Sequence, residues 1–418
     1  MNLYNLKTNN IYKLYLIFYL LSLKYFAIEV SYIVSLVLFL VLLLKANKFN
    51  KLILFIVFGL LMIVIIGIVS SLFSHPITRD FIKDLVYFSK PILVIINVYK
   101  LISLIKNKNF LVKLTVYLGT FSAIFHFFAL TYYVPKIGFQ LETLRHTIIG
   151  QGNILEGLAF VFLLVKDKNS KIYVAIKYKI FLMLLLITSI LLYFSRTDLV
   201  VLLILSIGIK GFIRPKKKTF YFITAILIAS STFLYSLSFL NLKNNDGSGV
   251  KMFLHKIQNS SNEIFSNSIK RSDTYAIHSN WRAYEANAAI NQINDGKKIN
   301  KTIGEGFGAL VNLKLKINLG GEDFRYIPML HNGYAYLYFK TGLIGLIIYV
   351  SIFLITFIFG FIKKTNDMIV IHLITSVSLT IMFTSLVITG IYGASDLLLV
   401  YLISMIAIYN NTLSNKYE

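Results

Sequence analysis

A chain of 418 residues that is 57% hydrophobic and only 14% charged does not have the composition of a soluble globular protein, in which about 25% of residues are charged. Its mean hydropathy of +0.72 instead predicts a protein that lies within a membrane. A formal net charge of +24 can indicate nucleic-acid binding, but here the basic residues lie mainly between apolar segments. Membrane topology therefore accounts for the charge, and we expect no nucleic-acid partner. The lack of cysteine excludes disulfides and thiolate metal sites.

Twelve apolar segments are candidates for transmembrane helices, each of which needs about 20 mostly apolar residues. In chain order they cover residues 11–28, 30–44, 52–73, 85–105, 111–132, 149–165, 180–194, 199–212, 219–240, 342–362, 368–391 and 397–409. The residues before the first segment lack the charged region and cleavage site of a secretory signal, so we expect that segment to be retained. The predicted fold is an all-α polytopic membrane protein with about 12 transmembrane helices.

The connection between the ninth and tenth predicted helices is far longer than usual and divides the chain into three regions. These are a nine-helix region (1–240), a large loop (241–330), and a last region (331–418) with an interfacial segment and three helices. Because Lys and Arg collect in cytoplasmic loops, their distribution predicts that both termini are cytoplasmic and the large loop is extracytoplasmic. Within that loop, a predicted helix ends near Asp295 and Gly296.

Most of the histidines and the large loop map to the outer side of the membrane, where we expect the active site. Nucleotide sugars, ATP and coenzyme A are cytoplasmic, so an outward-facing enzyme needs an activated donor that sits in the membrane or crosses it. A lipid-linked donor meets this requirement. No metal site or cofactor is predicted, since the adjacent acidic pair, Glu322 and Asp323, is interpreted as part of a solvated turn. The glycine-rich segment 302–310 lacks the Lys-Ser/Thr of a P-loop.

Two of the basic residues at or within the predicted helices are candidate site residues. Arg196 follows an apolar segment too short for the full bilayer, which puts it near or below the membrane surface. An Arg at that depth normally faces a cavity and meets an anion, and its planar fork suits a phosphate. Pairing with Asp198 at the surface is the alternative. Lys90, beside Pro91 in the fourth helix, is expected to face the protein interior.

Three polar residues of the large loop have helical spacing. His278, Arg282 and Glu285 fall at positions i, i+4 and i+7, which places them on one face if the segment is a continuous helix. Such a face is either a polar site or the solvated surface of an ordinary helix.

The segment that begins at His331 carries the most specific pattern. A helix over residues 331–362 is too long for the bilayer, so we expect a break at Gly342, with an interfacial segment before it and a spanning helix after it. Gly342 and Gly345 permit close helix packing. His331 is then at the outer mouth of the bundle, where a lipid pyrophosphate would lie.

His331-Asn332, a nine-residue gap and Gly342-Leu343-Ile344-Gly345 fit the His-Asn/Ser/Gln, nine-residue, Gly-x-x-Gly motif of one known superfamily. The chain resembles the Wzy-type O-antigen polymerase and O-antigen ligase superfamily. Its predicted twelve helices, its late extracytoplasmic loop, an Arg at an outer hairpin (Arg196) and an Arg in the loop (Arg282) are also similar to that family. The resemblance covers residues 195–345, and the helix count extends it to the rest of the chain.

The resemblance implies glycosyl transfer from an undecaprenyl-diphosphate-linked glycan at the periplasmic face, without a metal or another cofactor. An acceptor hydroxyl would attack the anomeric carbon directly, with inversion, as the diphosphate leaves. His331 is the expected base or acceptor-orienting group, and Arg196 and Arg282 are expected to bind the diphosphate. Glu285 is either the base itself or an orienting partner of Arg282.

Further binding residues are candidates on weaker grounds. Lys90 and Arg145 are additional possible contacts for the diphosphate, and Asn332 and His278 are possible substrate contacts. No flanking motif fixes which loop arginine matches the family, so Arg271 and Arg325 remain alternatives to Arg282.

The preferred function is a polymerase for O-antigen or capsule that joins lipid-linked repeat units in the bacterial inner membrane, with a chain-length regulator as a possible partner. A ligase that transfers the glycan to lipid A-core is the alternative within the superfamily. A lipid-linked oligosaccharide flippase belongs to another class, and it predicts ionisable residues along many helices. A membrane O-acyltransferase would need His126 or His372, and neither has a supporting motif.

Overall fold

The computed structural model describes residues 3–45, 49–74, 76–138, 153–213, 217–239, 249–266, 269, 273–319, 321–363, 367–393 and 397–414. Arg145 and Arg271 lie outside the described residues. Within the described part the chain is almost entirely helical, with one two-stranded sheet.

The apolar parts of the chain form helices in two groups. Before the large loop come α1 (Leu3–Tyr25), α2 (Ile28–Leu43), α3 (Lys51–Ser71), α4 (Thr78–Leu104), α5 (Asn109–Ile137), α7 (Asn153–Leu163), α8 (Lys179–Leu192), α9 (Arg196–Ile209) and α10 (Lys217–Ser238). After it come α16 (Gly333–Ile362), α17 (Met368–Val387), the short 3-10 helix η1 (Gly390–Tyr392) and α18 (Leu397–Ser414). Each of the twelve predicted apolar segments overlaps one of these helices, as expected where the backbone has to satisfy its own hydrogen bonds.

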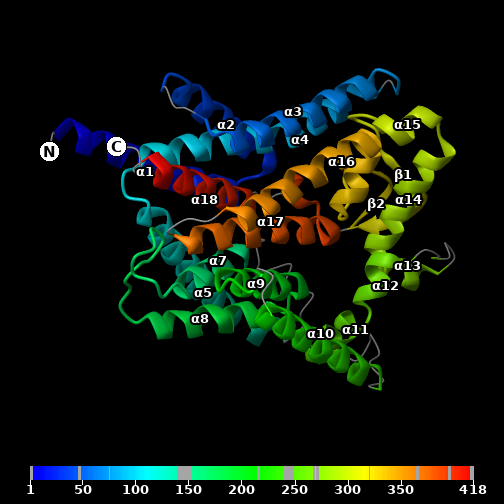
Figure 1. Cartoon of the computed structure of the whole chain (residues 1–418). Helices are drawn as coiled ribbons and strands as arrows, with labels where there is room; N and C mark the ends of the chain where they lie inside the picture. Colours follow the sequence, from blue (N-terminus) through cyan, green and yellow to red (C-terminus); the bar gives the residue numbers. More distant parts are fainter. Residues whose placement is uncertain are drawn as a thin grey trace.

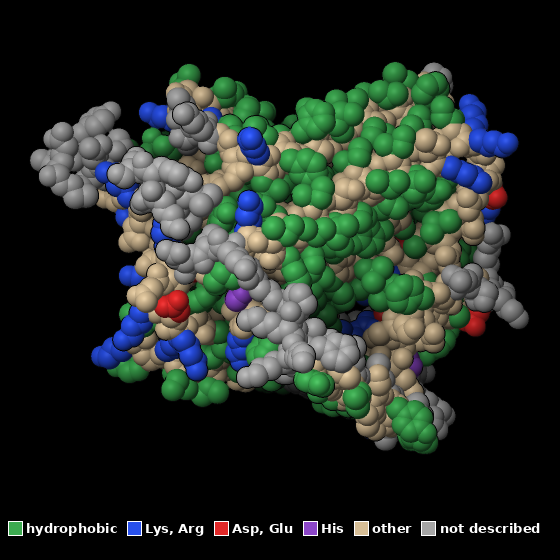
Figure 2. All heavy atoms as spheres, in the orientation of Figure 1, with side chains coloured by type: hydrophobic (Ala, Val, Ile, Leu, Met, Phe, Trp, Pro, Cys, Tyr) green, Lys and Arg blue, Asp and Glu red, His purple; other side chains and the backbone are tan. Residues whose placement is uncertain are grey.

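Five of the described helices are long and apolar enough to cross a membrane: α3, α4, α5, α16 and α17. Shorter apolar helices include α2, α8, residues 154–163 of α7 and residues 397–410 of α18. Large hydrophobic side chains such as Phe58, Phe121 and Phe128 are more than half exposed on this bundle. In Figure 2, hydrophobic side chains dominate the middle of the visible face, whereas Lys and Arg gather toward its left and right ends. This distribution is that of a protein embedded in a membrane.

The helices run roughly alongside one another in Figure 1 and define two ends of the bundle. α16 packs against α3 and α17, and α17 also packs against α9 and α18. The start of α1 and the end of α18 lie at one end, on the left of the figure, and the helices and the sheet of residues 274–327 lie toward the other. The two chain termini are therefore remote from the segment that covers the right-hand end of α16.

We call residues 249–327 the loop region. It contains α11 (Gly249–Gln258), α12 (Ser260–Phe265), α13 (Thr274–Ser279), α14 (Trp281–Asp295), α15 (Lys298–Ile303) and the strands β1 (Val311–Leu319) and β2 (Glu322–Ile327). The end of α14 at Asp295, with Gly296 as its C-cap, confirms the predicted helix stop. The antiparallel hairpin was not predicted: Glu322 pairs with Leu319 and Asp323 with Asn318, so the acidic pair belongs to a strand.

The predicted break in α16 is present. Gly342 has φ +64° and ψ −165°, which divides α16 into a segment from Gly333 and a longer apolar helix. A Cβ at this position would lie 2.4 Å from the backbone of Thr302 and Ile303, so α15 rests directly on the break. Only glycine combines this conformation with so close an approach.

The glycine-rich turn at residues 304–308 fastens the loop region to the helices. The N–H groups of Glu305 and Gly306 donate to the carbonyls of Phe339 and Lys340 at 2.8 and 3.1 Å, just before the break in α16. Phe307 donates from its N–H to the carbonyl of Gly67 on α3 at 3.1 Å. The glycines of this turn therefore have a structural role, which agrees with the rejection of a P-loop.

Candidate functional site

Arg196 and Arg282 lie on either side of one carboxylate. Arg196, the first residue of α9, donates from Nη2 to Oε2 of Glu263 at 2.6 Å and from Nη1 to the hydroxyl of Ser260 at 2.8 Å. Arg282, near the start of α14, places Nη1 3.1 Å from Oε1 of the same Glu263. The side chains of both arginines remain partly exposed, at 22% and 24%. Two arginines 86 positions apart in sequence thus share one carboxylate partner.

Glu263 was missed by sequence reasoning. It lies on the six-residue helix α12, in a part of the loop for which the sequence analysis predicts no helix. Nothing in its own neighbourhood distinguishes it from a surface carboxylate, since both partners come from other elements. The bridge also means that Arg196 does not use Asp198 as its counter-ion, because its described contacts go to α11 and α12.

A second pair joins α14 to the start of α16. The Glu285 carboxylate accepts a short hydrogen bond from the backbone N–H of His331, and Oε2 lies 3.1 Å from Nδ1 of the imidazole. Glu285 is 1% exposed, whereas the His331 side chain is 55% exposed. The buried carboxylate therefore contacts one ring nitrogen, Nδ1, of a half-exposed histidine.

One helix carries both parts of the site. Arg282 and Glu285 are three residues apart on α14, hence neighbours on the helix surface. Burial lowers the pKa of Arg282 from its ordinary value, and Arg196 acts in the same direction, while Glu263 and Glu285 oppose the change. Guanidinium stays charged at neutral pH despite such a shift. Figure 2 shows this face of the molecule hollowed between the α16–α17 helices and α11–α12, with charged atoms visible inside.

The remaining predicted residues are distributed differently. His278 is exposed on α13, and the helix is interrupted at Asn280 (φ −121°, ψ 36°), so the predicted continuous face from His278 through Arg282 is wrong. Asn332 is the N-cap of α16: its side chain accepts from the N–H groups of Tyr334 and Ala335. The carbonyl oxygen of the Asn332 side chain therefore serves to cap the helix.

Lys90 is buried in α4, as expected for a residue that faces the protein interior. It lies on a different element from the arginine and histidine groups, and no described contact connects it with them. Arg145, outside the described residues, is not placed. Gly342 and Gly345 shape α16: at Gly345 a Cβ would lie 2.0 Å from Oγ1 of Thr341.

A buried ion pair beside the glycine-rich turn was also missed. Asp84 on α4 accepts from Nζ of Lys340 on α16 at 2.5 Å and from the N–H of Gly308 at 2.6 Å. The hydroxyl of Tyr336 donates to its other oxygen at 3.1 Å. A charged residue just before each of two apolar segments was the available sequence signal, since charged residues at membrane depth usually pair. This pair fixes the loop region to α4 and α16.

Among the described residues, no group of three or more His, Asp or Glu side chains is arranged to hold a metal ion. Comparison of the chain with protein-family models, with curated proteins and with solved structures finds no match. A buried carboxylate, Glu285, contacts a half-exposed histidine, and the same helix carries Arg282, one of two arginines that share a second carboxylate.

Proposed function

We propose that this chain is a bacterial surface-polysaccharide polymerase, which joins undecaprenyl-diphosphate-linked repeat units by glycosyl transfer at the periplasmic face of the inner membrane. One observation carries the proposal: α14 supplies both Glu285, which holds His331, and Arg282, which meets Arg196 at Glu263. The same helix thus holds the proton acceptor in place and supplies one arginine of the anion-binding group. Direct glycosyl transfer from a diphosphate donor requires both groups.

In the proposed reaction, an acceptor hydroxyl attacks the anomeric carbon of the donor sugar. The new bond joins the acceptor oxygen to that carbon, while the bond from the carbon to the phosphate oxygen breaks, with inversion. The hydroxyl proton passes to Nε2 of His331. Glu285 supports this transfer, because a carboxylate at Nδ1 orients the ring and stabilises the imidazolium that forms.

The leaving group is undecaprenyl diphosphate, which departs with its negative charge. Arg196 and Arg282 are suited to receive it, because guanidinium donates parallel hydrogen bonds to phosphate oxygens. Their shared partner, Glu263, lies between them before the donor binds. In this mechanism the diphosphate takes over the guanidinium groups from Glu263.

The proposed location follows from topology. With all twelve apolar helices crossing the bilayer, both termini are cytoplasmic and the loop region is periplasmic, on the side where a lipid-linked donor is presented. The opposite placement of the chain termini and the loop region in Figure 1 supports this arrangement. The exposed His331 side chain then opens to the periplasm, at the end of α16 near the membrane surface.

An in vitro transfer assay tests the proposal. The purified chain in lipid nanodiscs is given undecaprenyl-diphosphate-linked repeat unit, with or without lipid A-core, and the products are separated on a gel. We expect a ladder from the lipid-linked donor alone and none from the His331→Ala variant. A product that requires lipid A-core would identify a ligase instead. Translocation of the donor without any new glycosidic bond would favour a flippase and refute the proposal.

A further inference from the structure

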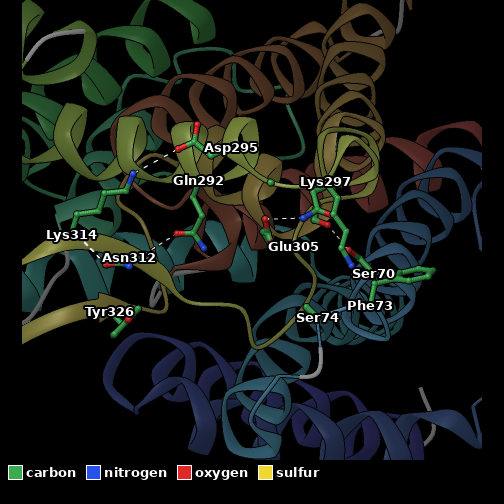
Figure 3. A pocket seen from close by; sticks show the side chains of 13 residues that line it. Ser70, Phe73, Ser74, Gln292, Asp295, Lys297, Glu305, Asn312, Lys314 and Tyr326 are labelled. Atoms are coloured by element: carbon green, nitrogen blue, oxygen red, sulfur yellow. Dashed lines mark hydrogen bonds and ion pairs between the residues drawn. The ribbon is translucent and has the colours of Figure 1, made fainter.

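A second hollow lies at the other end of α14 from Arg282. Its cavity of about 530 Å³ is bounded by the end of α3, the end of α14, α15, the glycine-rich turn and the hairpin. Figure 3 shows side chains from these elements around one common space, with Gln292, Asn312 and Lys314 on one side and Ser74 and Phe73 on the other. The volume falls in the range of about 300–1,000 Å³ that is usual for small-molecule sites.

The hydrogen-bonding groups that line this pocket are mostly neutral and held in place. The Gln292 carbonyl oxygen accepts from the N–H of Asn312 at 2.9 Å, and its amide nitrogen donates to the carbonyl of Leu310 at 3.2 Å. Asn300 donates to a carboxylate oxygen of Glu305 at 2.9 Å. Amides and carboxylates fixed in this way retain further lone pairs and N–H groups for a ligand rich in hydroxyls.

The charges of the pocket are balanced. Asp295 and Glu305 contribute two carboxylates, and Lys297 and Lys314 contribute two ammonium groups. Lys314 lies 3.7 Å from Asp295, so one ammonium group and one carboxylate are already paired. A strongly anionic ligand such as a diphosphate gains little from this arrangement, in contrast to the Arg196–Arg282 site. The balance favours a ligand with little net charge.

Two aromatic rings complete the lining. Phe73, just after α3, and Tyr326 on β2 are 54% and 48% exposed. An accessible ring gives a flat apolar surface on which the C–H face of a sugar can lie, while polar side chains bind its hydroxyl edges. Aromatic rings combined with fixed amides and balanced charge are the chemistry expected of a saccharide site.

The position of the pocket indicates which saccharide it takes. Gln292 follows Glu285 by seven residues, two turns of α14, or about 10 Å along the helix axis. Arg282, Glu285 and Gln292 thus succeed one another along α14. With a diphosphate at Arg282 and the proton acceptor beside Glu285, the donor sugar lies near the N-terminal end of α14. The pocket lies beyond the proton acceptor, where the acceptor chain would extend.

We infer that this pocket is the acceptor subsite, which binds a near-neutral oligosaccharide several sugar positions from the reacting hydroxyl. The inference rests on the proposed function for the assignment to the acceptor, but the binding of saccharide at this pocket can be measured separately. The probe is lipid-free oligosaccharide released by mild acid from the surface polysaccharide of the source cells. Binding to the full chain in nanodiscs is followed by saturation-transfer NMR and calorimetry.

Three variants test the pocket. Tyr326→Ala removes the ring, Ser74→Trp fills the rim, and Tyr326→Phe retains the ring without its hydroxyl. Tyr275→Ala is the matched control, because Tyr275 is a comparably exposed tyrosine on α13 that does not line the pocket. We expect Tyr326→Ala and Ser74→Trp to weaken oligosaccharide binding about tenfold or more, and Tyr326→Phe by less. Tyr275→Ala should bind like the unchanged chain.

The outcomes separate the two proposals. Unchanged binding in both Tyr326→Ala and Ser74→Trp, or no binding by the unchanged chain, would refute the assignment of the pocket as a saccharide site. Transfer that requires His331 but is unchanged by these substitutions would refute the acceptor subsite and remain consistent with the proposed function. Saccharide binding that depends on Tyr326 in a chain that transfers no sugar would keep the saccharide site and refute the polymerase. Undecaprenyl diphosphate binding, measured in parallel, should be unaffected by the pocket variants.

Discussion

Glu285 holds His331 by two groups at once, the backbone N–H and the ring Nδ1. The two residues are 46 positions apart and belong to α14 and the start of α16. The buried carboxylate occupies Nδ1 of the exposed imidazole. Nε2 is then the ring nitrogen that is left for chemistry.

The pair should act as a unit. His331→Ala and Glu285→Gln are each expected to lower the rate of transfer by about 100- to 10,000-fold, the usual contribution of general acid–base catalysis. The double variant should be little slower than the slower single variant, because the two residues serve one step. Initial rates of polymer formation provide the measurement, with the exposed Glu322→Gln as the control. Full activity of Glu285→Gln would remove the carboxylate from the mechanism.

The arginine site should depend on guanidinium geometry as well as charge. Arg196→Ala and Arg282→Ala are expected to abolish transfer while membrane insertion stays intact. Arg196→Lys and Arg282→Lys should each reduce the rate about 100-fold, because an ammonium cannot replace the planar fork. Arg325→Lys, at an exposed position of β2, is the matched control and should retain activity. Loss of transfer only in the Arg325 variant would show that Arg325, and not Arg282, is the loop arginine that the mechanism needs.

The Asp84–Lys340 pair should stabilise the fold by mutual neutralisation. Asp84→Asn leaves a buried ammonium without its charged partner, and we expect a loss of about 3–5 kcal/mol in the free energy of unfolding. Lys340→Met alone leaves the carboxylate unpaired and should also destabilise. The Asp84→Asn/Lys340→Met double variant should recover part of the loss, as measured by unfolding in a titration with denaturing detergent. Strictly additive losses would show that the two side chains do not interact.

The break in α16 should tolerate glycine alone. Gly342→Ala forces an L-residue into the positive-φ region, at a cost of about 1–3 kcal/mol, and also drives a methyl group into α15. Gly321→Ala shares the positive φ (+95°) but meets no atom within 4 Å. Comparing the two by thermal unfolding separates strain from collision, and Gly342→Ala should lower the melting temperature more. Equal shifts would mean that contact with α15 contributes nothing.

Lys108, between α4 and α5, should make stability depend on alkaline pH. Burial, with a smaller effect of Lys171, lowers its pKa from 10.5 to about 8. The folded chain therefore releases this proton before the unfolded chain does, so the cost of burying the charge is full below pH 8 and disappears as pH rises toward 10.5. The melting temperature of the unchanged chain should rise across this window relative to Lys108→Met. Parallel pH profiles for the two chains would contradict the assignment.

The sequence predicted the helices well because each is encoded locally. Apolar length indicated the helical segments, Gly296 marked the end of α14, and the excess length of the segment after His331 required a break at Gly342. The hairpin also had a local signal that was not used. In β1, Leu313, Leu315 and Ile317 alternate with polar residues, the period of a strand, before the glycines at 320 and 321.

The contacts that assemble the site could not be predicted in the same way. Glu263 reaches Arg196 across 67 positions, and Asp84 reaches Lys340 across 256. Such partners are determined by tertiary packing, and no spacing in the sequence encodes them. The interruption at Asn280 is a further case, because residues on both sides have the composition of one helix. The arginines, the histidine and Glu285 were predicted as individual residues, whereas Glu263 and the contacts that join these residues were found only in the fold.

The break at Gly342 has a mechanical consequence for the proposed function on a lipid-linked donor. The membrane part of α16 changes tilt when bilayer thickness changes, and a straight helix would carry His331 up or down with it. Here the glycine-rich turn donates hydrogen bonds to the carbonyls of Phe339 and Lys340 just before the break. We therefore expect tilting to be taken up at Gly342, so that His331 keeps its height relative to α14. Under the proposed function, the reacting groups would then be insulated from the thickness of the surrounding lipid.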